Sequence, residues 1–277
     1  MTILTFSIIL LLGSYLAGLL GSLTGLGGGV VVIPLLTLVF GVDIRYAIGA
    51  ALLASIATSS GSASAYVKEG ITNIRLGMFL EIATTIGAVI GALIAVYTPT
   101  NTIAILFGAV LMFSAAMTLR KKNQEALTEG SKLSYLLKLN SSYPTKDGEV
   151  SYKLKNVGAG FSMMTVAGVI SGLLGIGSGA LKVLAMDTAM RIPFKVSTTT
   201  SNFMIGVTAA ASAVVYLQRG YMDPGLAFPV ILGVLGGAFT GSKLLTRMNP
   251  QVLRYIFCAA ITFVALQMIY NGIQHKF

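Results

Sequence analysis

The stretch GSLTGLGGG at residues 21–29 and its counterpart SGLLGIGSG at residues 171–179 decide how this chain folds. Each is a glycine-rich break between two apolar segments, and glycine permits positive φ angles and close approach of the backbone. Inside a membrane, irregular backbone is tolerated only where it is buried in protein or lines a cavity. Two breaks at matching positions of two halves therefore indicate a binding site. The alternative is that the glycines only allow helices to pack closely.

Composition predicts an integral membrane protein. The 277 residues are 55% hydrophobic and 10% charged, whereas soluble domains carry roughly 25% charged residues. The strand alternation of a β-barrel is not evident, so the spans are expected to be helices. The net charge of +10 is concentrated in connections and ends, which indicates orientation in the membrane and no nucleic-acid surface. One cysteine, Cys258, and one histidine, His275, offer no metal cluster, and we expect no metal or cofactor.

Ten apolar segments follow one another along the chain. Those at residues 30–40 and 180–190 are about half of the ~20 residues that a crossing needs. The remaining eight are long enough to cross, and we expect them at residues 3–20, 47–67, 76–97, 102–119, 157–174, 196–217, 224–245 and 252–270.

The second half of the chain repeats the first at a constant offset, as Gly27 with Gly177 and Thr58 with Thr208 illustrate. Each half has three clear crossings and one pair broken by glycines, which crosses twice or dips in and returns. Each half therefore crosses an odd number of times, and the two halves run in opposite directions. The predicted fold class is an all-α polytopic membrane protein with two inverted-topology repeats.

The predicted domains are a first repeat at residues 1–119, a linker at 120–156 and a second repeat at 157–277. With the N-terminus outside, the basic excess, including that of the linker, faces the cytoplasm of a cell inner membrane. Leucines of the linker could form a short interfacial helix, although a solvated connector is the expected form of such a polar segment.

The breaks are the candidate anion site. Each precedes a short helix, which starts near Val30 or Ala180, and a helix N-terminus presents free N–H groups and partial positive charge. Tips that enter from opposite faces would meet near the midplane and bind one small anion between them. The candidate substrate-binding residues in the breaks are Gly25, Gly27, Gly28, Gly29, Gly175, Gly177, Ser178 and Gly179.

Three charged residues stand inside apolar segments, where they are costly and often functional. Lys182 could reach the second break and neutralise an anion, or instead snorkel to an interface or pair with Asp187. Glu81 and Asp187 are candidates for carrying a coupling proton. For Glu81 the alternative is an interfacial pair with Arg75, and for Asp187 it is a helix-end ion pair with Arg191.

A polar stripe runs along the third segment of each half, and its spacing of three and four places it on one helix face. Its hydroxyls could replace water around an oxyanion or bond between helices. Tyr66 and Tyr216, near the helix ends, are expected in an interfacial aromatic belt. The stripe contributes the candidate substrate-binding residues Thr58, Ser62, Ser201, Asn202 and Thr208.

The first break with Ile33-Pro34-Leu35-Leu36 after it, the second break and the run at residues 197–201 resemble the TauE/SafE family of sulfite exporters. The resemblance covers nearly the whole chain outside the linker. It implies an inner-membrane carrier for sulfur-containing anions such as sulfite or sulfonates. Ser178 in place of Gly28, and the lack of a second-half proline matching Pro34, make the two half-sites unequal.

We therefore expect a secondary transporter for small sulfur-containing oxyanions that works by alternating access. A channel-like anion pathway is the alternative, and no catalytic motif suggests an enzyme. The expected partners are a small anionic solute and the lipid bilayer, with proton coupling as a hypothesis and no nucleic acid. The sequence leaves export or import, the coupling ion and the oligomeric state, including a homo-oligomer, open.

Overall fold

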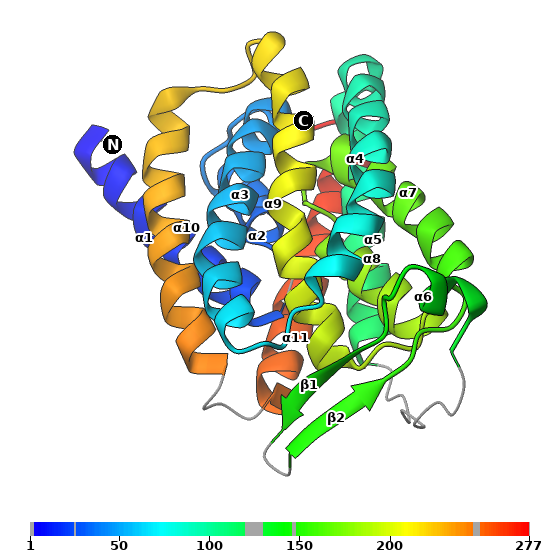
Figure 1. The fold of residues 1–277 in the computed structure, drawn as a ribbon. Helices are drawn as coiled ribbons and strands as arrows, with labels where there is room; N and C mark the ends of the chain where they lie inside the picture. The colour runs from blue at the N-terminus through cyan, green and yellow to red at the C-terminus, as the bar shows by residue number, and fades with distance from the viewer. Residues whose placement is uncertain (1–2, 25, 120–129, 146–147, 246–249, 277) are drawn as a thin grey trace.

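The computed structural model describes residues 3–24, 26–119, 130–145, 148–245 and 250–276, which form a helical bundle with a small hairpin at one end (Figure 1). The first half contains α1 Ile3–Thr24, α2 Gly29–Pro34, the π-helical turn η1 Leu35–Val39, α3 Ile44–Lys68, α4 Ile74–Tyr97 and α5 Thr100–Leu119. The linker contains α6 Lys132–Leu136, β1 Ser141–Thr145 and β2 Gly148–Tyr152, an antiparallel pair. The second half contains α7 Val157–Leu174, α8 Gly179–Leu184, η2 Ala185–Ala189, α9 Phe194–Gln218, α10 Pro224–Leu245 and α11 Pro250–Ile273.

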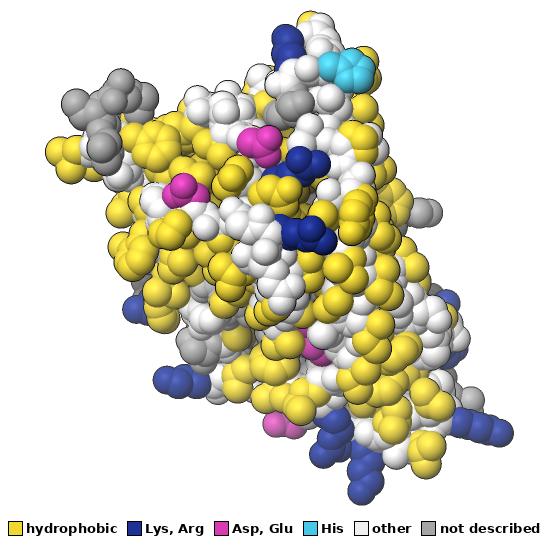
Figure 2. Space-filling model, turned by 90° about the horizontal axis from the view of Figure 1, so that it is seen from above, with side chains coloured by type: hydrophobic (Ala, Val, Ile, Leu, Met, Phe, Trp, Pro, Cys, Tyr) yellow, Lys and Arg dark blue, Asp and Glu magenta, His cyan; other side chains and the backbone are white. Residues whose placement is uncertain are grey.

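The all-α polytopic fold is confirmed. Within the described part of the chain, six helices are long and apolar enough to cross a membrane, namely α1, α3, α4, α7, α9 and α10. Viewed from above, hydrophobic side chains cover most of the visible face and charged ones are few (Figure 2). On α4 the exposed side chains Met78, Ile82 and Ile86 recur every fourth residue, which is the pattern of a lipid-facing stripe.

The elements of the two halves correspond in position. α2 and α8 begin at residues 29 and 179, and α3 and α9 begin at residues 44 and 194, so both pairs differ by 150. The equivalent helices α3 and α9 run in opposite directions where they meet (Figure 1), and the Ser59 hydroxyl on α3 donates to the Asn202 carbonyl on α9 at 2.6 Å. The inverted orientation across a bilayer stays a prediction.

Each short helix passes into a π-helical turn, η1 after α2 and η2 after α8. Pro34 ends α2 in the first half, whereas Leu184 holds the equivalent position in the second. Because both halves have the turn and only one has the proline, the proline is not its cause. The π-helical turn belongs to the path that both halves share, and such turns often mark functional sites.

The outer helices pack in equivalent pairs, α1 with α10 and α4 with α7, through glycine contacts. A Cβ atom at Gly91 would lie 1.9 Å from the Val169 carbonyl oxygen, and one at Gly237 would lie 1.9 Å from the Tyr15 carbonyl oxygen. These helices approach backbone to backbone, as small residues permit in membranes. These glycines, which lie outside the two breaks, therefore serve close packing of the outer helices.

The linker differs from a purely solvated connector. Leu139 and Leu154 are buried at 1% and 0% exposure in a cluster with side chains of α4, η2 and α9. The Asn73 side chain accepts from the Leu76 N–H and caps α4. Its amide donates to the Leu139 carbonyl and to the Tyr152 hydroxyl, both at 2.9 Å. Burial raises the pKa of Tyr152 above its ordinary value, so this hydroxyl stays protonated at neutral pH.

We predict that Gly237→Ala lowers the free energy of unfolding by about 1–3 kcal/mol, since the added methyl group forces α1 and α10 apart. Gly158→Ala is the matched control, because a Cβ there meets nothing within 4 Å. Unfolding in mixed detergent micelles measures both. Equal stability of the two variants would show that the α1–α10 contact tolerates separation.

Candidate functional site

The two glycine breaks are buried and lie against each other. A Cβ at Gly29 would lie 3.1 Å from the carbonyl oxygen of Gly175. One at Gly27 would lie 3.4 Å from the Ile205 Cγ2 atom, and one at Gly177 would lie 2.8 Å from the same atom. The breaks therefore converge on one side chain of α9, although they are far apart in sequence.

Ser55 of α3 completes this meeting point. Its Oγ atom lies 3.6 Å from the Cβ positions of both Gly27 and Gly177. Ser55 and Ile205 differ by 150 in number, so they are equivalent residues of the two halves. Where α3 and α9 cross, each half thus supplies one side chain that touches both breaks.

The backbone of both breaks includes left-handed residues. Gly27 has φ +82° and its equivalent Gly177 has φ +66°. Ser178 has φ +50°, which costs a non-glycine residue about 1–2 kcal/mol. Gly28, its equivalent, is right-handed with φ −65°. Such strain persists only where surrounding contacts impose it, and it clusters at functional sites.

Side chains of α3 and α9 satisfy backbone groups of the breaks. The Gly28 N–H donates to Thr58 Oγ1 at 3.0 Å, and the Ser201 hydroxyl donates to the Gly179 carbonyl at 3.1 Å. The Asn202 amide donates to the Ser22 carbonyl at 3.3 Å. Three residues of the polar stripe therefore hold the breaks in place, which is the bonding role that the sequence left open, and their contact with a substrate stays a prediction.

Tyr66 and Tyr216 have the same structural role, and the aromatic-belt expectation for them is wrong. They are buried at 1% and 2% exposure. The Tyr66 hydroxyl donates to the Ser22 carbonyl at 3.1 Å, and the Tyr216 hydroxyl donates to the equivalent Gly172 carbonyl at 3.4 Å. Each tyrosine thus ties the start of a break, where α1 or α7 ends, to a central helix.

Four polar atoms in or beside the breaks have no hydrogen-bond partner among the described residues. They are Ser55 Oγ, Ser171 Oγ, Ser178 Oγ and Asn202 Oδ1, on side chains that are at most 1% exposed. Buried polar groups are normally paired, so orphaned ones require an explanation. Two hydroxyls that can donate stand where the breaks meet.

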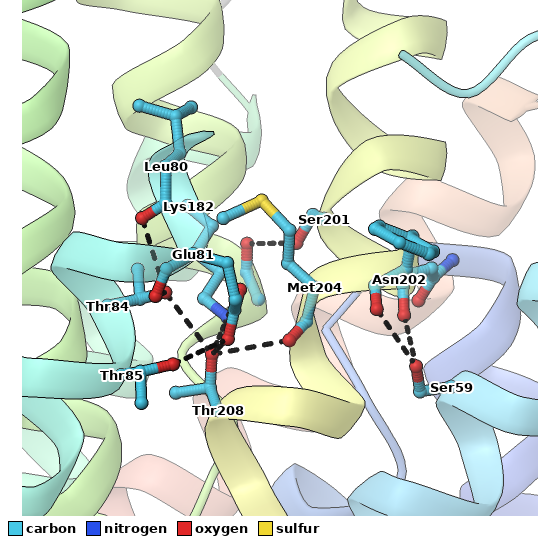
Figure 3. Close-up of polar contacts among 12 residues, drawn as sticks. Ser59, Leu80, Glu81, Thr84, Thr85, Lys182, Ser201, Asn202, Met204 and Thr208 are labelled. Carbon is cyan, nitrogen blue, oxygen red and sulfur yellow. Dashed lines mark hydrogen bonds and ion pairs between the residues drawn. The ribbon is translucent and has the colours of Figure 1, made fainter. Parts of the chain in front are cut away.

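Beside the second break lies a buried charge pair (Figure 3). Lys182 of α8 is fully buried, and its Nζ atom lies 3.7 Å from Glu81 Oε2 of α4. Thr208 of α9 contacts both, because Lys182 Nζ donates to Thr208 Oγ1, and this hydroxyl donates to Glu81 Oε1 at 2.5 Å. Thr85 also donates to Glu81 Oε1, at 3.3 Å. Lys182 therefore pairs with Glu81, not with Asp187.

The charge pair joins the two halves and has no counterpart at the equivalent positions. The positions equivalent to Lys182 and Glu81 are Val32 and Ile231, both apolar. Thr58, the equivalent of Thr208, bonds to Gly28 and to the Ala54 carbonyl. The surroundings of the two breaks are therefore asymmetric in charge.

Some predicted residues are placed differently. Gly25 lies outside the described residues. Ser62 is buried, but its hydroxyl donates to the Thr58 carbonyl of its own helix. Asp187 is part-exposed in η2. Arg75 donates to the Lys138 carbonyl, so it serves the linker and does not serve Glu81.

Sequence reasoning missed Ile205, Thr84 and Thr85 and left Ser55 out of the candidate set. The repeat offset could have identified Ser55 and Ile205 as equivalent residues, because their numbers differ by 150, the offset that also aligns the two breaks. Thr84 and Thr85 follow Glu81 at the helical spacings of three and four, which places them beside the carboxylate. In the described chain, no three His, Cys, Asp or Glu side chains gather as metal ligands.

The fold and the site together define the class of membrane protein. Six apolar helices surround two buried interruptions of the backbone, and an ion pair lies at the depth of the spans. In polytopic membrane proteins, intramembrane charges and broken helices mark pathways for solutes or ions.

Comparison with known proteins specifies the family. The profile described as Sulfite exporter TauE/SafE matches residues 10–268. "Probable membrane transporter protein YunE" of Bacillus subtilis is 28% identical over 97% of this chain and 99% of its own length. "Probable membrane transporter protein MJ0441" of Methanocaldococcus jannaschii is 22% identical over 94% of each chain. No solved structure matches. The chain belongs to the sulfite exporter TauE/SafE family, a family of multi-pass membrane transporters.

We predict that Gly177→Ala abolishes transport, because its methyl group meets Ile205 at 2.8 Å and its φ is +66°. Gly220→Ala is the matched control, since its φ of +74° imposes a similar backbone cost while a Cβ there meets nothing within 4 Å. Transport by both variants, normalised to the amount in the membrane, distinguishes them. Equal activity would demote the second break to a packing element.

We also predict that Lys182→Met destabilises the protein by about 3–5 kcal/mol, because it leaves the Glu81 carboxylate buried without its charge partner. The double variant Glu81→Gln with Lys182→Met removes both charges and recovers most of that loss. Unfolding in mixed micelles tests the cycle. If the losses in free energy of unfolding of the two single variants simply add in the double variant, the two charges do not stabilise each other.

Proposed function

We propose that this protein is a secondary transporter for small sulfur-containing oxyanions, and that the substrate binds where the two glycine breaks meet. The observation that carries the proposal is the convergence of Gly27 and Gly177 on Ser55 and Ile205. Family membership supports the class of substrate. The first-turn N–H groups of α2 and α8 lack acceptors within their own helices, as at every helix start.

The chemistry of the meeting point suits an oxyanion. Oxyanion oxygens accept hydrogen bonds, and the Ser55 and Ser178 hydroxyls are buried donors without partners in the described chain. Lys182 lies three residues after Gly179 and supplies positive charge near the second break. Hydroxyls and amides of this kind replace the water that an anion loses when it enters a buried site.

Alternating access is the proposed mechanism. The equivalent helices α3 and α9 cross antiparallel at the site, so rocking of one half against the other would open the site to each side in turn. Of the two carboxylates considered for proton coupling, Glu81 contacts Lys182. We place the protein in the cytoplasmic membrane with the linker inside, since Arg75 and the linker lie at the same end of the bundle.

Flux into proteoliposomes tests the proposal. We expect saturable uptake of sulfite or methanesulfonate and accumulation against the substrate gradient when a driving gradient is imposed. Uptake that neither saturates nor accumulates would identify the channel-like pathway instead. Absence of binding or flux for sulfite, sulfonates, sulfate and thiosulfate would refute the substrate class.

Ser178→Gly tests the position of the site. Glycine adopts the left-handed conformation without strain, so stability should not fall. Loss of one hydrogen bond to a charged ligand should weaken binding by about tenfold or more. Ser60→Ala, on the exposed face of α3, is the control and should bind as the wild type. Unchanged affinity in Ser178→Gly would remove this hydroxyl from the site.

A further inference from the structure

The Glu81–Lys182 pair is balanced in charge but incompletely bonded. Lys182 is fully buried, and Glu81 Oε2 has no hydrogen-bond partner within the described structure. Its contact with Lys182 Nζ is electrostatic, at 3.7 Å, which is beyond hydrogen-bond distance. A buried carboxylate in a permanent structural pair is expected to use both oxygens. One oxygen of Glu81 is therefore available for protonation without the loss of a hydrogen bond.

We propose that Glu81 is an internal counter-ion that the transported anion replaces at Lys182, so that binding of one anion takes up one proton onto Glu81. This inference rests on the proposed function. In the resting state the lysine and the ionised carboxylate sum to zero charge. In the loaded state the lysine, one monovalent anion and the protonated carboxyl group also sum to zero. Each state therefore avoids an uncompensated buried charge.

Thr208 makes the exchange feasible. Its hydroxyl accepts from Lys182 and donates to Glu81, and it lies 3.2 Å from the Met204 carbonyl. A hydroxyl is both donor and acceptor and rotates to suit its neighbours. When Glu81 takes up a proton on Oε2, Thr208 can keep donating to Oε1 or turn and donate to the Met204 carbonyl. The same side chain thus serves both protonation states.

Few other ionisable groups face Glu81. α7 carries none, and on α9 only Lys195 and Tyr216 can ionise. They stand thirteen and eight residues from Thr208, which is about 20 Å and 12 Å along a helix. α8 contributes Lys182, and η2 contributes the part-exposed Asp187. Thr84 and Thr85 of α4 itself are neutral. Lys182 is thus the charge that controls Glu81.

Charge balance also selects the substrate. A monovalent sulfonate or hydrogen sulfite leaves the loaded site neutral, whereas sulfate or thiosulfate leaves one uncompensated negative charge. We therefore infer that the site prefers monovalent sulfur oxyanions over divalent ones. The preference follows from Lys182 being the single cation in the described core of the bundle.

Binding of methanesulfonate to the purified protein across about pH 5 to 9 tests the inference, because the sulfonate itself stays ionised there. In the wild type, Kd should rise with pH, by up to about tenfold per pH unit, and a pH dye should report one proton taken up per anion bound. Glu81→Gln should bind methanesulfonate without pH dependence or proton uptake. Sulfate should bind at least tenfold more weakly to the wild type.

Glu149→Gln, on the exposed strand β2, is the matched control and should keep the wild-type pH dependence. A pH slope that persists in Glu81→Gln, or that disappears only in Asp187→Asn, would overturn the role of Glu81. If Glu81→Gln does not fold, the dye measurement on the wild type decides alone, and binding without proton uptake overturns the inference. Absence of any sulfur-anion binding at every pH would instead refute the proposed function.

Discussion

Backbone polar groups at membrane depth must find partners inside the protein, and this constraint organises the structure. Each glycine break interrupts a helix, so its amides and carbonyls require bonds from elsewhere. α3 and α9 supply them through Thr58, Ser201 and Asn202. Tyr66 and Tyr216 bind carbonyl groups at the start of each break. The central helices are polar on one face because they support unwound backbone.

The same arrangement brings the two breaks together. α3 and α9 cross at the centre, and each contributes a residue, Ser55 or Ile205, that touches both breaks. The outer helices are held by equivalent glycine contacts between α1 and α10 and between α4 and α7. The α1–α10 contact and the α4–α7 contact involve equivalent helices, so the backbones of the two halves follow the same path. The side chains on that path are free to differ.

The side chains of the two halves differ in their charge. Lys182 of the second half lies beside Glu81 of the first half and near Thr208, whereas the equivalent positions, Val32 and Ile231, are apolar. A duplicated backbone therefore carries a single charged locus. One buried cation limits how much negative charge the centre can hold, since a further charge would lack a partner in a medium of low dielectric constant. Charge balance is thus the physical basis of our proposals on substrate and coupling.

The sequence by itself determined the membrane class, the helix order, the position of the breaks and the repeat offset, because hydropathy and glycine position are local properties of the chain. It also selected Lys182, Glu81 and most of the residues around the breaks. Only the tertiary structure decided that Lys182 pairs with Glu81, that both central tyrosines are buried and that Leu139 docks the linker. Those outcomes depend on how the helices rotate and cross. The Glu81–Lys182 pair in addition depends on how the two halves dock, because its two residues belong to different halves. A periodic pattern shows which face of a helix is polar, whereas the packing of the other helices decides what that face meets.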